Sequence, residues 1–365
     1  MEITAAVVRE PRGRFLLEKM ELEGPRDSEL VVEIKAVGVC HTDLLARDGL
    51  YPPPLPLVCG HEGAGLVTRV GKKVTKVKPG DRVVLSFVSC GVCRNCLIGK
   101  PNYCDDMFHL NFGGRRADGS SPIRSNGEVI NSLFGGQSSF ATHVLVAERT
   151  VTKVPDGLSF EILAPLGCAV QTGAGSVANA LQPPPGASLA VFGVGSVGLC
   201  AVMMARIAGC DPIIAVDRRA NRLEVARSVG ATHTVDASRE DPVEAIKSIT
   251  GGGADYSLEV TGVPAVSRQA LDCLRETGVC GQVGAPPYGV DVAFDGTNLL
   301  RGRTVRGIII GDSLPDRFVP ELIALNQSGR LPFDRLIERF PFERINDAAA
   351  ASEAGEVIKA VLVMS

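Results

Sequence analysis

Four thiols fall within one short stretch of the chain. Two residues separate Cys90 from Cys93 and Cys93 from Cys96, and Cys104 follows after seven more. Two-residue gaps let neighbouring sulfurs converge on one ion, and four thiolates close a tetrahedral shell around zinc. A closed shell leaves no position for a substrate, so we expect a structural zinc site. An iron–sulfur cluster also takes four cysteines and is the alternative, although nothing else in the sequence points to electron transfer.

A second set of metal-binding residue types is spread along the chain. Cys40, His61 and Cys168 together would give three ligands and leave a fourth position open, as in catalytic zinc sites. A zinc ion held in this way can act as a Lewis acid on an oxygen bound at the open position. Each of these residues taken singly is more often structural, and spacing alone does not unite Cys168 with the other two.

A glycine-rich loop lies between an apolar run and an apolar helical pattern, at Gly193-Val194-Gly195-Ser196-Val197-Gly198. This context favours a dinucleotide-binding loop over a tight turn without a ligand. Gly193 permits the turn, Gly195 lets the backbone approach a pyrophosphate, and Gly198 lets helix and strand pack closely. The N-terminus of the following helix attracts phosphate groups.

An acidic residue ends the next apolar run. Asp217 is placed to accept hydrogen bonds from the adenosine ribose hydroxyls and to repel a 2′-phosphate, which favours NAD over NADP. Arg218, Arg219 and Arg222 follow at once, and arginine can bind such a phosphate. The sequence therefore favours NAD without excluding NADP.

The predicted secondary structure changes near residue 160, from strands and irregular segments to alternating strands and helices. Alternating runs at 5–8, 29–34 and 82–85 predict strands, and the polar, glycine-rich stretch 105–139 predicts a long irregular segment. Beyond residue 160, strands and helices alternate, which predicts a parallel sheet with helices on both faces. The expected strands are 188–193, 212–217, 234–236, 256–260 and 278–283, and the expected helices are 195–208, 221–229, 241–250 and 264–274.

Composition excludes several classes of protein. The chain has 365 residues, which suits two domains, and a net charge of −3 without a basic stripe, which argues against nucleic-acid binding. The uncharged stretch 182–205 is interrupted by prolines and glycines, which favours strand, turn and helix over a membrane span. Eleven cysteines without a secretory signal indicate a reduced, cytoplasmic protein rather than a disulfide framework.

These motifs, in this order, resemble the zinc-containing medium-chain alcohol dehydrogenases over nearly the whole chain. The resemblance rests on Gly60-His61-Glu62-Gly63-Ala64-Gly65, the four-cysteine stretch, Cys40-His41-Thr42-Asp43 and the late glycine loop, while 134–142 and 167–175 look closest to the aryl-alcohol (benzyl alcohol) branch. It implies an α/β fold with a β-rich GroES-like catalytic domain, 1–169 continued by 306–365, and a Rossmann doubly wound domain, 170–305. It also implies NAD, two zinc ions per chain and a homo-oligomer, either a dimer or a tetramer.

The resemblance assigns a role to each matching residue. The catalytic zinc ligands are Cys40, His61 and Cys168, with Glu62 behind the metal and Asp43 holding the imidazole of His61. Thr42 handles the proton of the substrate. The other matches are His41 and Lys359 at the cofactor pyrophosphate, Thr172 and Val283 at the nicotinamide, and Phe87 and Phe140 in the substrate pocket, where core packing is the alternative.

The implied reaction is oxidation of a primary, aromatic alcohol to its aldehyde with hydride transfer to NAD. One departure bears on the proton: liver-type enzymes end their relay at a histidine or serine, whereas this chain has Leu45. The proton must leave through water or another group. The alternatives are an allylic terpene alcohol or S-hydroxymethylglutathione as substrate, and a nucleotide-binding protein of the same fold without catalysis.

Overall fold

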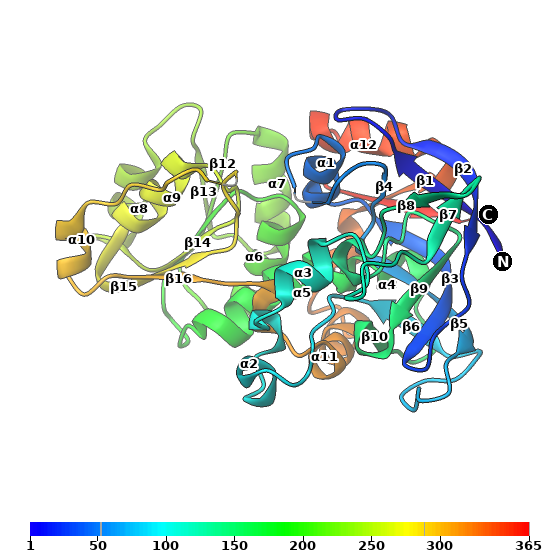
Figure 1. Cartoon of the computed structure of the whole chain (residues 1–365). Coiled ribbons are helices and arrows are strands. Elements are labelled where there is room, and N and C mark those ends of the chain that lie inside the picture. The colour runs from blue at the N-terminus through cyan, green and yellow to red at the C-terminus, as the bar shows by residue number, and fades with distance from the viewer. Residues whose placement is uncertain (52, 288, 365) are drawn as a thin grey trace. The chain divides into compact units, whose positions relative to one another are not determined.

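The computed structural model describes residues 1–51, 53–287 and 289–364 (Figure 1). The chain forms two compact units. The first comprises Met1–Cys168, Leu314–Glu321 and the chain from Leu336 on, and the second comprises Ala169–Ser313 and Leu322–Arg335. The return to the first unit is thus interrupted, where the sequence analysis expected one continuous segment from residue 306.

The first unit is built on two sheets. One has the order β4-β1-β2-β7-β8 with antiparallel neighbours; the other has the order β10-β6-β5-β3-β18-β17, with β9 also paired to β3. Alternating apolar residues fill the space between them, and the core includes Val7, Ile34 and Leu362. The strands are β1 (Glu2–Val8), β2 (Leu16–Leu22), β3 (Glu29–Gly38), β4 (Leu57–Val58), β5 (Gly63–Val70), β6 (Arg82–Leu85), β7 (Ile123–Ser125), β8 (Glu128–Ile130), β9 (His143–Ala147), β10 (Val151–Lys153), β17 (Ile337–Pro341) and β18 (Lys359–Val363).

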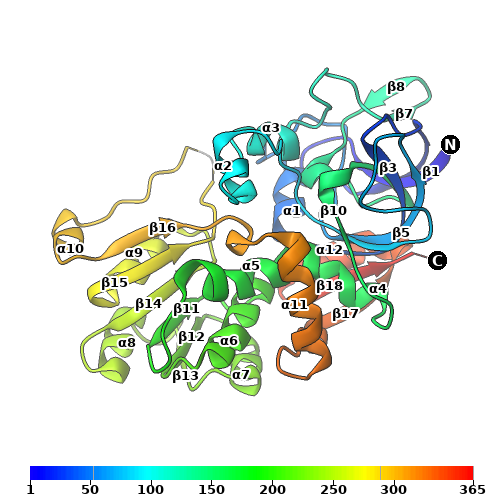
Figure 2. The ribbon, with the colours of Figure 1, turned by 90° about the horizontal axis from the view of Figure 1, so that it is seen from below.

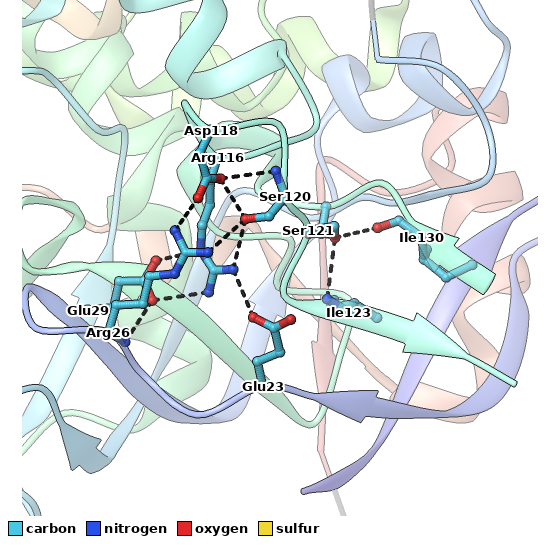
Figure 3. Close-up of polar contacts among 10 residues, drawn as sticks. Glu23, Arg26, Glu29, Arg116, Asp118, Ser120, Ser121, Ile123 and Ile130 are labelled. Carbon is cyan, nitrogen blue, oxygen red and sulfur yellow. Dashed lines mark hydrogen bonds and ion pairs between the residues drawn. The ribbon is translucent and has the colours of Figure 1, made fainter. Parts of the chain in front are cut away.

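Short helices complete the first unit: α1 (His41–Arg47), α2 (Arg94–Leu97), α3 (Met107–Phe112), α4 (Phe160–Leu163) and α12 (Ile345–Ala354). The predicted irregular stretch 105–139 contains α3, β7 and β8, which are too short to give a periodic pattern. The buried Arg116 attaches this stretch to the segment between β2 and the start of β3. Its guanidinium group forms ion pairs with Glu29 at 2.7 Å and with Glu23 at 2.9 Å (Figure 3). Beside it, Arg26 pairs with Asp118 at 2.7 Å.

The second unit is a six-stranded parallel sheet of order β13-β12-β11-β14-β15-β16. Helices α6 and α7 lie on one face and α8 and α9 on the other (Figure 2). The strands are β11 (Leu189–Phe192), β12 (Ile213–Asp217), β13 (His233–Asp236), β14 (Ala254–Glu259), β15 (Leu274–Gln282) and β16 (Thr304–Gly307). The helices are α5 (Ala169–Gly175), α6 (Ser196–Ala208), α7 (Ala220–Val229), α8 (Pro242–Thr250), α9 (Pro264–Asp272) and α10 (Gly296–Leu300), while the residues of α11 (Pro315–Gln327) are divided between the two units.

The predicted alternation of strand and helix is confirmed for every element between 188 and 283, with ends shifted by a few residues. Helix ends are local signals: Asp241 accepts the N–H groups of Val243 and Glu244 at the start of α8, where Pro242 needs no hydrogen-bond acceptor. Within the described ranges no helix has the length and apolar character of a membrane span, and the uncharged stretch 182–205 becomes a turn, β11 and most of α6.

Candidate metal centre

Four ligand groups from three separate segments converge in the first unit. Cys40, His61, Glu62 and Cys168 each place a sulfur, nitrogen or oxygen atom so that these atoms all lie within 4.8 Å of one another. A zinc ion binds thiolate sulfur at about 2.3 Å and imidazole nitrogen at about 2.0 Å, so ligand atoms on one ion stand about 3–4 Å apart. The donor set therefore fits a zinc ion, and it includes the three predicted ligands.

One carboxylate positions two of these ligands. Cys40 is the N-cap of α1, and its backbone N–H donates to Asp43 Oδ2 at 3.0 Å. The other oxygen of Asp43 accepts the N–H of Gly60 at 3.0 Å and lies 2.8 Å from His61 Nδ1. Asp43 is fully buried, so its interactions are shielded from water. With Nδ1 of His61 engaged in this way, Nε2 is left for a metal.

Close backbone contacts bring Cys168 beside His61. A Cβ atom on Gly167 would lie 2.2 Å from the carbonyl oxygen of Leu85, so only glycine lets the segment before Cys168 pack against β6. The Ser86 hydroxyl then donates to the Gly167 carbonyl at 2.8 Å. This packing explains how residues more than a hundred positions apart can share one ion.

Gln137 ties the same segments together and was not singled out as a site residue from the sequence. Its Nε2 donates to the carbonyl oxygens of His61 at 2.9 Å and Ser86 at 3.1 Å, while its Oε1 accepts the N–H of Gly63 at 3.0 Å. The side chain is 2% exposed. The amide therefore fixes the backbone on both sides of Glu62.

A buried ion pair lies behind the ligands. Lys359 Nζ lies 2.5 Å from Glu62 Oε2 and donates to the carbonyl oxygen of Val39 at 3.1 Å. Both side chains are buried, and the Glu62 carboxylate covers Gly38, where a Cβ would lie 2.0 Å from Oε2. The predicted role of Lys359 at the cofactor pyrophosphate stays a prediction; the structure places its ammonium group against Glu62.

The ligands perturb one another's protonation. Burial raises the pKa of Glu62 to about 7, against the opposing effect of Lys359. A hydrogen bond with Cys168, together with His61, lowers the pKa of Cys40 well below its ordinary value. Burial opposes the charged imidazole, but Asp43 and Cys40 raise the pKa of His61 well above its ordinary value. The group thus stabilises a thiolate at Cys40, the form that binds metal.

Thr42, the residue predicted to handle the substrate proton, lies next to the ligand Cys40. Thr42 Oγ1 is 3.9 Å from Cys40 Sγ, and its side chain is half-buried, whereas the neighbouring His41 is exposed. A hydroxyl in this position can both donate and accept a hydrogen bond. The roles of Thr42 and His41 stay predictions, and their placement on the first turn of α1 is compatible with them.

A row of aromatic rings leads away from His61. Phe134 lies 5.7 Å from the His61 ring, Phe112 lies 5.5 Å from Phe134, and Tyr51 lies 5.0 Å from Phe112, all at edge-on angles. Burial, followed by the thiols of Cys40 and Cys168, raises the pKa of Tyr51. The Tyr51 hydroxyl therefore lies within electrostatic reach of the metal ligands. No sequence signal distinguished these three rings from core residues.

The pocket roles of Phe87 and Phe140 stay predictions. Phe140 packs edge-on against Phe15 at 5.5 Å and is fully buried, as is Phe134. Phe87 is 7% exposed and lines a cavity of about 550 Å³, and none of the four metal-binding residues is among that cavity's described lining. The aromatic ring that contacts His61 is that of Phe134.

The four clustered cysteines form a second candidate metal site. Cys90, Cys93, Cys96 and Cys104 bring their sulfurs within 4.8 Å of one another. The Cys90 Sγ atom accepts a hydrogen bond from the backbone N–H of Cys93 at 3.3 Å, and the Cys104 Sγ atom accepts one from the backbone N–H of Cys90, also at 3.3 Å. Donors from Val92 and Cys93 lower the pKa of Cys90 to about 6, while burial raises the pKa of Cys104 to about 12. The arrangement matches a closed four-thiolate zinc shell.

The glycine loop of the second unit has the form that a pyrophosphate requires. Gly193 adopts φ +88°, which favours glycine, and a Cβ on Gly198 would lie 2.0 Å from the Gly193 carbonyl oxygen. Above Gly195 the space is open, since a Cβ there would meet only Arg222 Nη1 at 3.9 Å. Helix α6 begins at Ser196, so its free N–H groups, including that of Val197, belong to this loop.

The acid predicted for the ribose also supports the loop. Asp217 Oδ2 accepts the N–H of Val194 at 2.9 Å, and Arg222 lies 3.9 Å away. In the described part of the second unit, Thr172 Oγ1, Arg222 Nε and Gln282 Oε1 are buried without a hydrogen-bond partner. Buried polar atoms of this kind are rare unless a ligand or water completes them, so the unit fits a dinucleotide.

Comparisons with known proteins agree with both units. The family model for the alcohol dehydrogenase GroES-like domain matches residues 26–156, and the family model for zinc-binding dehydrogenases matches residues 196–327. The chain is 47% identical over 362 residues to geraniol dehydrogenase of Castellaniella defragrans, covering 98% of this chain and 97% of that protein.

Two solved structures superpose on the whole chain. Benzyl alcohol dehydrogenase of Acinetobacter calcoaceticus is 42% identical with a TM-score of 0.97, covering 100% of both chains. An alcohol dehydrogenase zinc-binding domain protein of Burkholderia ambifaria is 48% identical, also with a TM-score of 0.97, covering 100% of this chain and 99% of that one. The α/β fold predicted from the sequence, a GroES-like unit and a Rossmann-like parallel sheet, is confirmed. This chain belongs to the zinc-containing medium-chain alcohol dehydrogenases.

Proposed function

We propose that the chain oxidises a primary alcohol, preferably an aromatic one, to its aldehyde with transfer of hydride to NAD. The observation that carries the proposal is the convergence of Cys40, His61 and Cys168 around one point, with the Thr42 hydroxyl beside it. Three protein ligands leave one coordination position for the substrate.

The residues divide the chemistry between them. Cys40, His61 and Cys168 would hold the catalytic zinc, and Asp43 keeps the imidazole of His61 in the orientation for binding. When bound, zinc supplies Lewis-acid polarisation of the alcohol oxygen. Thr42 would hold the proton of the substrate hydroxyl at its Oγ1. Because Leu45 cannot accept a proton, that proton leaves through water or another group.

The second unit would hold the dinucleotide. NAD supplies the hydride acceptor of the reaction. The loop from Gly193 to Gly198 and the N-terminus of α6 would bind the pyrophosphate, with His41 as a further contact. Asp217 favours NAD because its carboxylate would repel a 2′-phosphate, although the nearby Arg222 favours the phosphate. The four-cysteine site would hold a second, structural zinc.

The aromatic preference is supported by Phe134, Phe112 and Tyr51 beside the metal group. Flat apolar groups pack well against such rings. The similarity to benzyl alcohol dehydrogenase supports the same preference, while the similarity to geraniol dehydrogenase supports an allylic terpene alcohol as the alternative. Benzyl alcohol and geraniol share one feature: the oxidised carbon is bonded to an unsaturated carbon.

A substrate panel tests the proposal. The full-length protein would be assayed with benzyl alcohol, geraniol, hexanol and S-hydroxymethylglutathione, each with NAD and with NADP, and zinc would be counted per chain. We expect the highest kcat/KM with benzyl alcohol and NAD. A higher kcat/KM with geraniol would select the terpene alternative, and full activity in protein with Cys40→Ser would remove the zinc mechanism.

A further inference from the structure

The second unit contains a buried acid to which the sequence analysis gave no role. Glu259 is the last residue of β14 and is fully buried. Burying a carboxylate costs free energy unless hydrogen-bond donors surround it. The donors around Glu259 therefore indicate what its charge is used for.

Its donors come from two loops at the same edge of the sheet. Oxygen Oε1 accepts the backbone N–H of Thr261 at 2.6 Å and of Gly262 at 3.1 Å, and also the Thr261 hydroxyl. Oxygen Oε2 accepts Nε2 of Gln282, the residue opposite Glu259 on β15, at 2.7 Å. The same Nε2 donates to the carbonyl oxygen of Gly284 at 2.7 Å. One carboxylate thus connects the ends of β14 and β15.

These two loops also pack against each other and against the glycine loop. A Cβ on Gly284 would lie 2.1 Å from the nitrogen of Gly262 and 2.6 Å from Glu259 Oε2. A Cβ on Gly193 would lie 2.6 Å from Cγ2 of Thr261. The segments that follow β11, β14 and β15 therefore form one packed group with Glu259 inside it.

The position of this group in the sheet identifies what it serves. The chain adds strands β12 and β13 on one side of β11 and strands β14 to β16 on the other, so the strand order reverses between β11 and β14. Dinucleotides bind in the crevice at such a point, outside the carboxyl ends of the strands. Asp217 ends β12, so the adenosine half lies on that side. The nicotinamide half then lies over the ends of β14 and β15, which Glu259 holds.

We propose that Glu259 is a positioning residue for the nicotinamide half of the cofactor, acting through the segments 260–262 and 283–284. The inference rests on the proposed function of the unit as a dinucleotide-binding domain. It links Glu259 to Val283, which the family resemblance places at the nicotinamide, because the Val283 N–H donates to the Glu259 carbonyl oxygen at 2.9 Å.

A carboxylate is needed here because every neighbour is a donor. Ionised Glu259 is an acceptor only, whereas a glutamine in its place would turn an NH₂ group towards the N–H groups of Thr261 or the NH₂ of Gln282. Burial raises the pKa of Glu259, against the hydrogen bonds from Thr261, Gly262 and Gln282. The isosteric substitution therefore disturbs the loops while it preserves volume.

The test compares a complete dinucleotide with a fragment that lacks nicotinamide. Kd values for NADH and for ADP-ribose would be measured by calorimetry on the wild-type protein, on Glu259→Gln and on Glu276→Gln, a control at an exposed glutamate of β15. Loss of one charge-assisted buried hydrogen bond predicts about tenfold weaker NADH binding in Glu259→Gln. ADP-ribose binding should change by less than about twofold, since its contacts lie on the other side of the glycine loop.

Equally weakened binding of NADH and ADP-ribose would overturn the proposal, because it would show that Glu259 has a general packing role. An unchanged Kd for NADH would also overturn it. If Glu259→Gln does not fold, Thr261→Val removes the hydroxyl that donates to Glu259 and should weaken NADH binding selectively, with the same two results overturning the proposal. A wild-type protein that binds neither NADH nor NADPH would instead refute the proposed function, so the two failures are distinguishable.

Discussion

The Asp43 carboxylate joins the two ends of the metal-binding segment: Oδ1 lies 2.8 Å from His61 Nδ1, and Oδ2 accepts the N–H of Cys40 at 3.0 Å. A single side chain on α1 therefore sets the positions of both a thiol and an imidazole ligand. Because Asp43 is fully buried, no water molecule can replace its carboxylate without a change in the packing.

Asp43→Asn should lower zinc binding at this group. The amide can still fill the space, but it cannot accept hydrogen bonds at both of its polar atoms, so the His61 ring loses its fixed orientation. We expect a loss of about 10- to 100-fold in zinc affinity or kcat/KM. Zinc per chain after dialysis against a chelator measures the first effect. Asp27→Asn, at an exposed acid paired with Lys73, is the control and should leave the zinc content unchanged.

Cys93→Ser should remove the second zinc without affecting the first. Serine cannot provide a thiolate, so the four-sulfur shell around Cys90, Cys96 and Cys104 is incomplete. The variant is expected to keep one zinc per chain, to unfold at a lower temperature, and to keep the kcat/KM of the remaining folded protein within about threefold. Elemental analysis measures the zinc content, thermal unfolding measures the loss of stability, and a steady-state assay measures kcat/KM. Loss of both metals at once would contradict the separation of the two sites.

Tyr51→Ala should change substrate preference more than cofactor binding. The ring contacts Phe112 and lies within electrostatic reach of Cys40 and Cys168. Removal of an aromatic wall should lower kcat/KM for benzyl alcohol by about tenfold, and for hexanol by less. Phe108→Ala, at a ring that is 63% exposed, is the matched control. A uniform loss across all alcohols would contradict a role for Tyr51 in specificity.

Asp217→Gly should relax the choice between NAD and NADP. The change removes the charge that would repel a 2′-phosphate and leaves Arg222 nearby, so the ratio of kcat/KM for NADP to that for NAD should rise by at least about tenfold. The glycine loop also loses the acceptor of the Val194 N–H, at a cost of about 1 kcal/mol in stability. Asp236→Gly, at the end of the adjacent strand, controls for the loss of a strand-end acid. An unchanged ratio would assign cofactor choice to other residues.

Asp255 should contribute stability that depends on pH. Burial favours its protonated form, but the N–H and hydroxyl of Ser188, at 2.9 and 2.6 Å, together with Arg275 lower the pKa of Asp255. A carboxyl whose pKa is lower in the folded state stabilises the fold above its unfolded pKa of about 3.9, and this contribution is lost as pH falls through the folded value.

Asp255→Asn should therefore lower the free energy of unfolding by about 1 kcal/mol at pH 7 and by much less near pH 3. Chemical denaturation at the two pH values measures the difference. Asp211→Asn provides a control at an acid with an exposed side chain. An equal loss at both pH values would show that packing, rather than charge, explains the effect.

Local motifs were predictable because the spacing of their residues carries the chemistry. The four-cysteine stretch and the loop from Gly193 to Gly198 each lie within one short segment. Their residues are therefore close in space because they are close in sequence, independently of the long-range packing. The alternation of strands and helices after residue 160 reflects buried apolar runs, which the sequence displays directly.

Long-range relationships were less predictable. Cys168 joins His61 only because Gly167 packs against Leu85, and no spacing rule contains that contact. Phe134 and Phe140 lie in one short segment, but Leu133 and Gly135 at positive φ redirect the chain and place the Phe134 ring beside His61. Without the backbone geometry the two rings are equivalent. The pairing of Lys359 with Glu62 depends in turn on β18 lying next to β3.

Strand β18 lies between β3 and β17 in the seven-stranded sheet, although β3 belongs to the first forty residues of the chain and β18 begins at Lys359. The ammonium group that balances the charge of Glu62 therefore comes from a strand that is distant in the sequence, so a displacement of β18 alone would leave a buried carboxylate uncompensated beside Cys40 and His61.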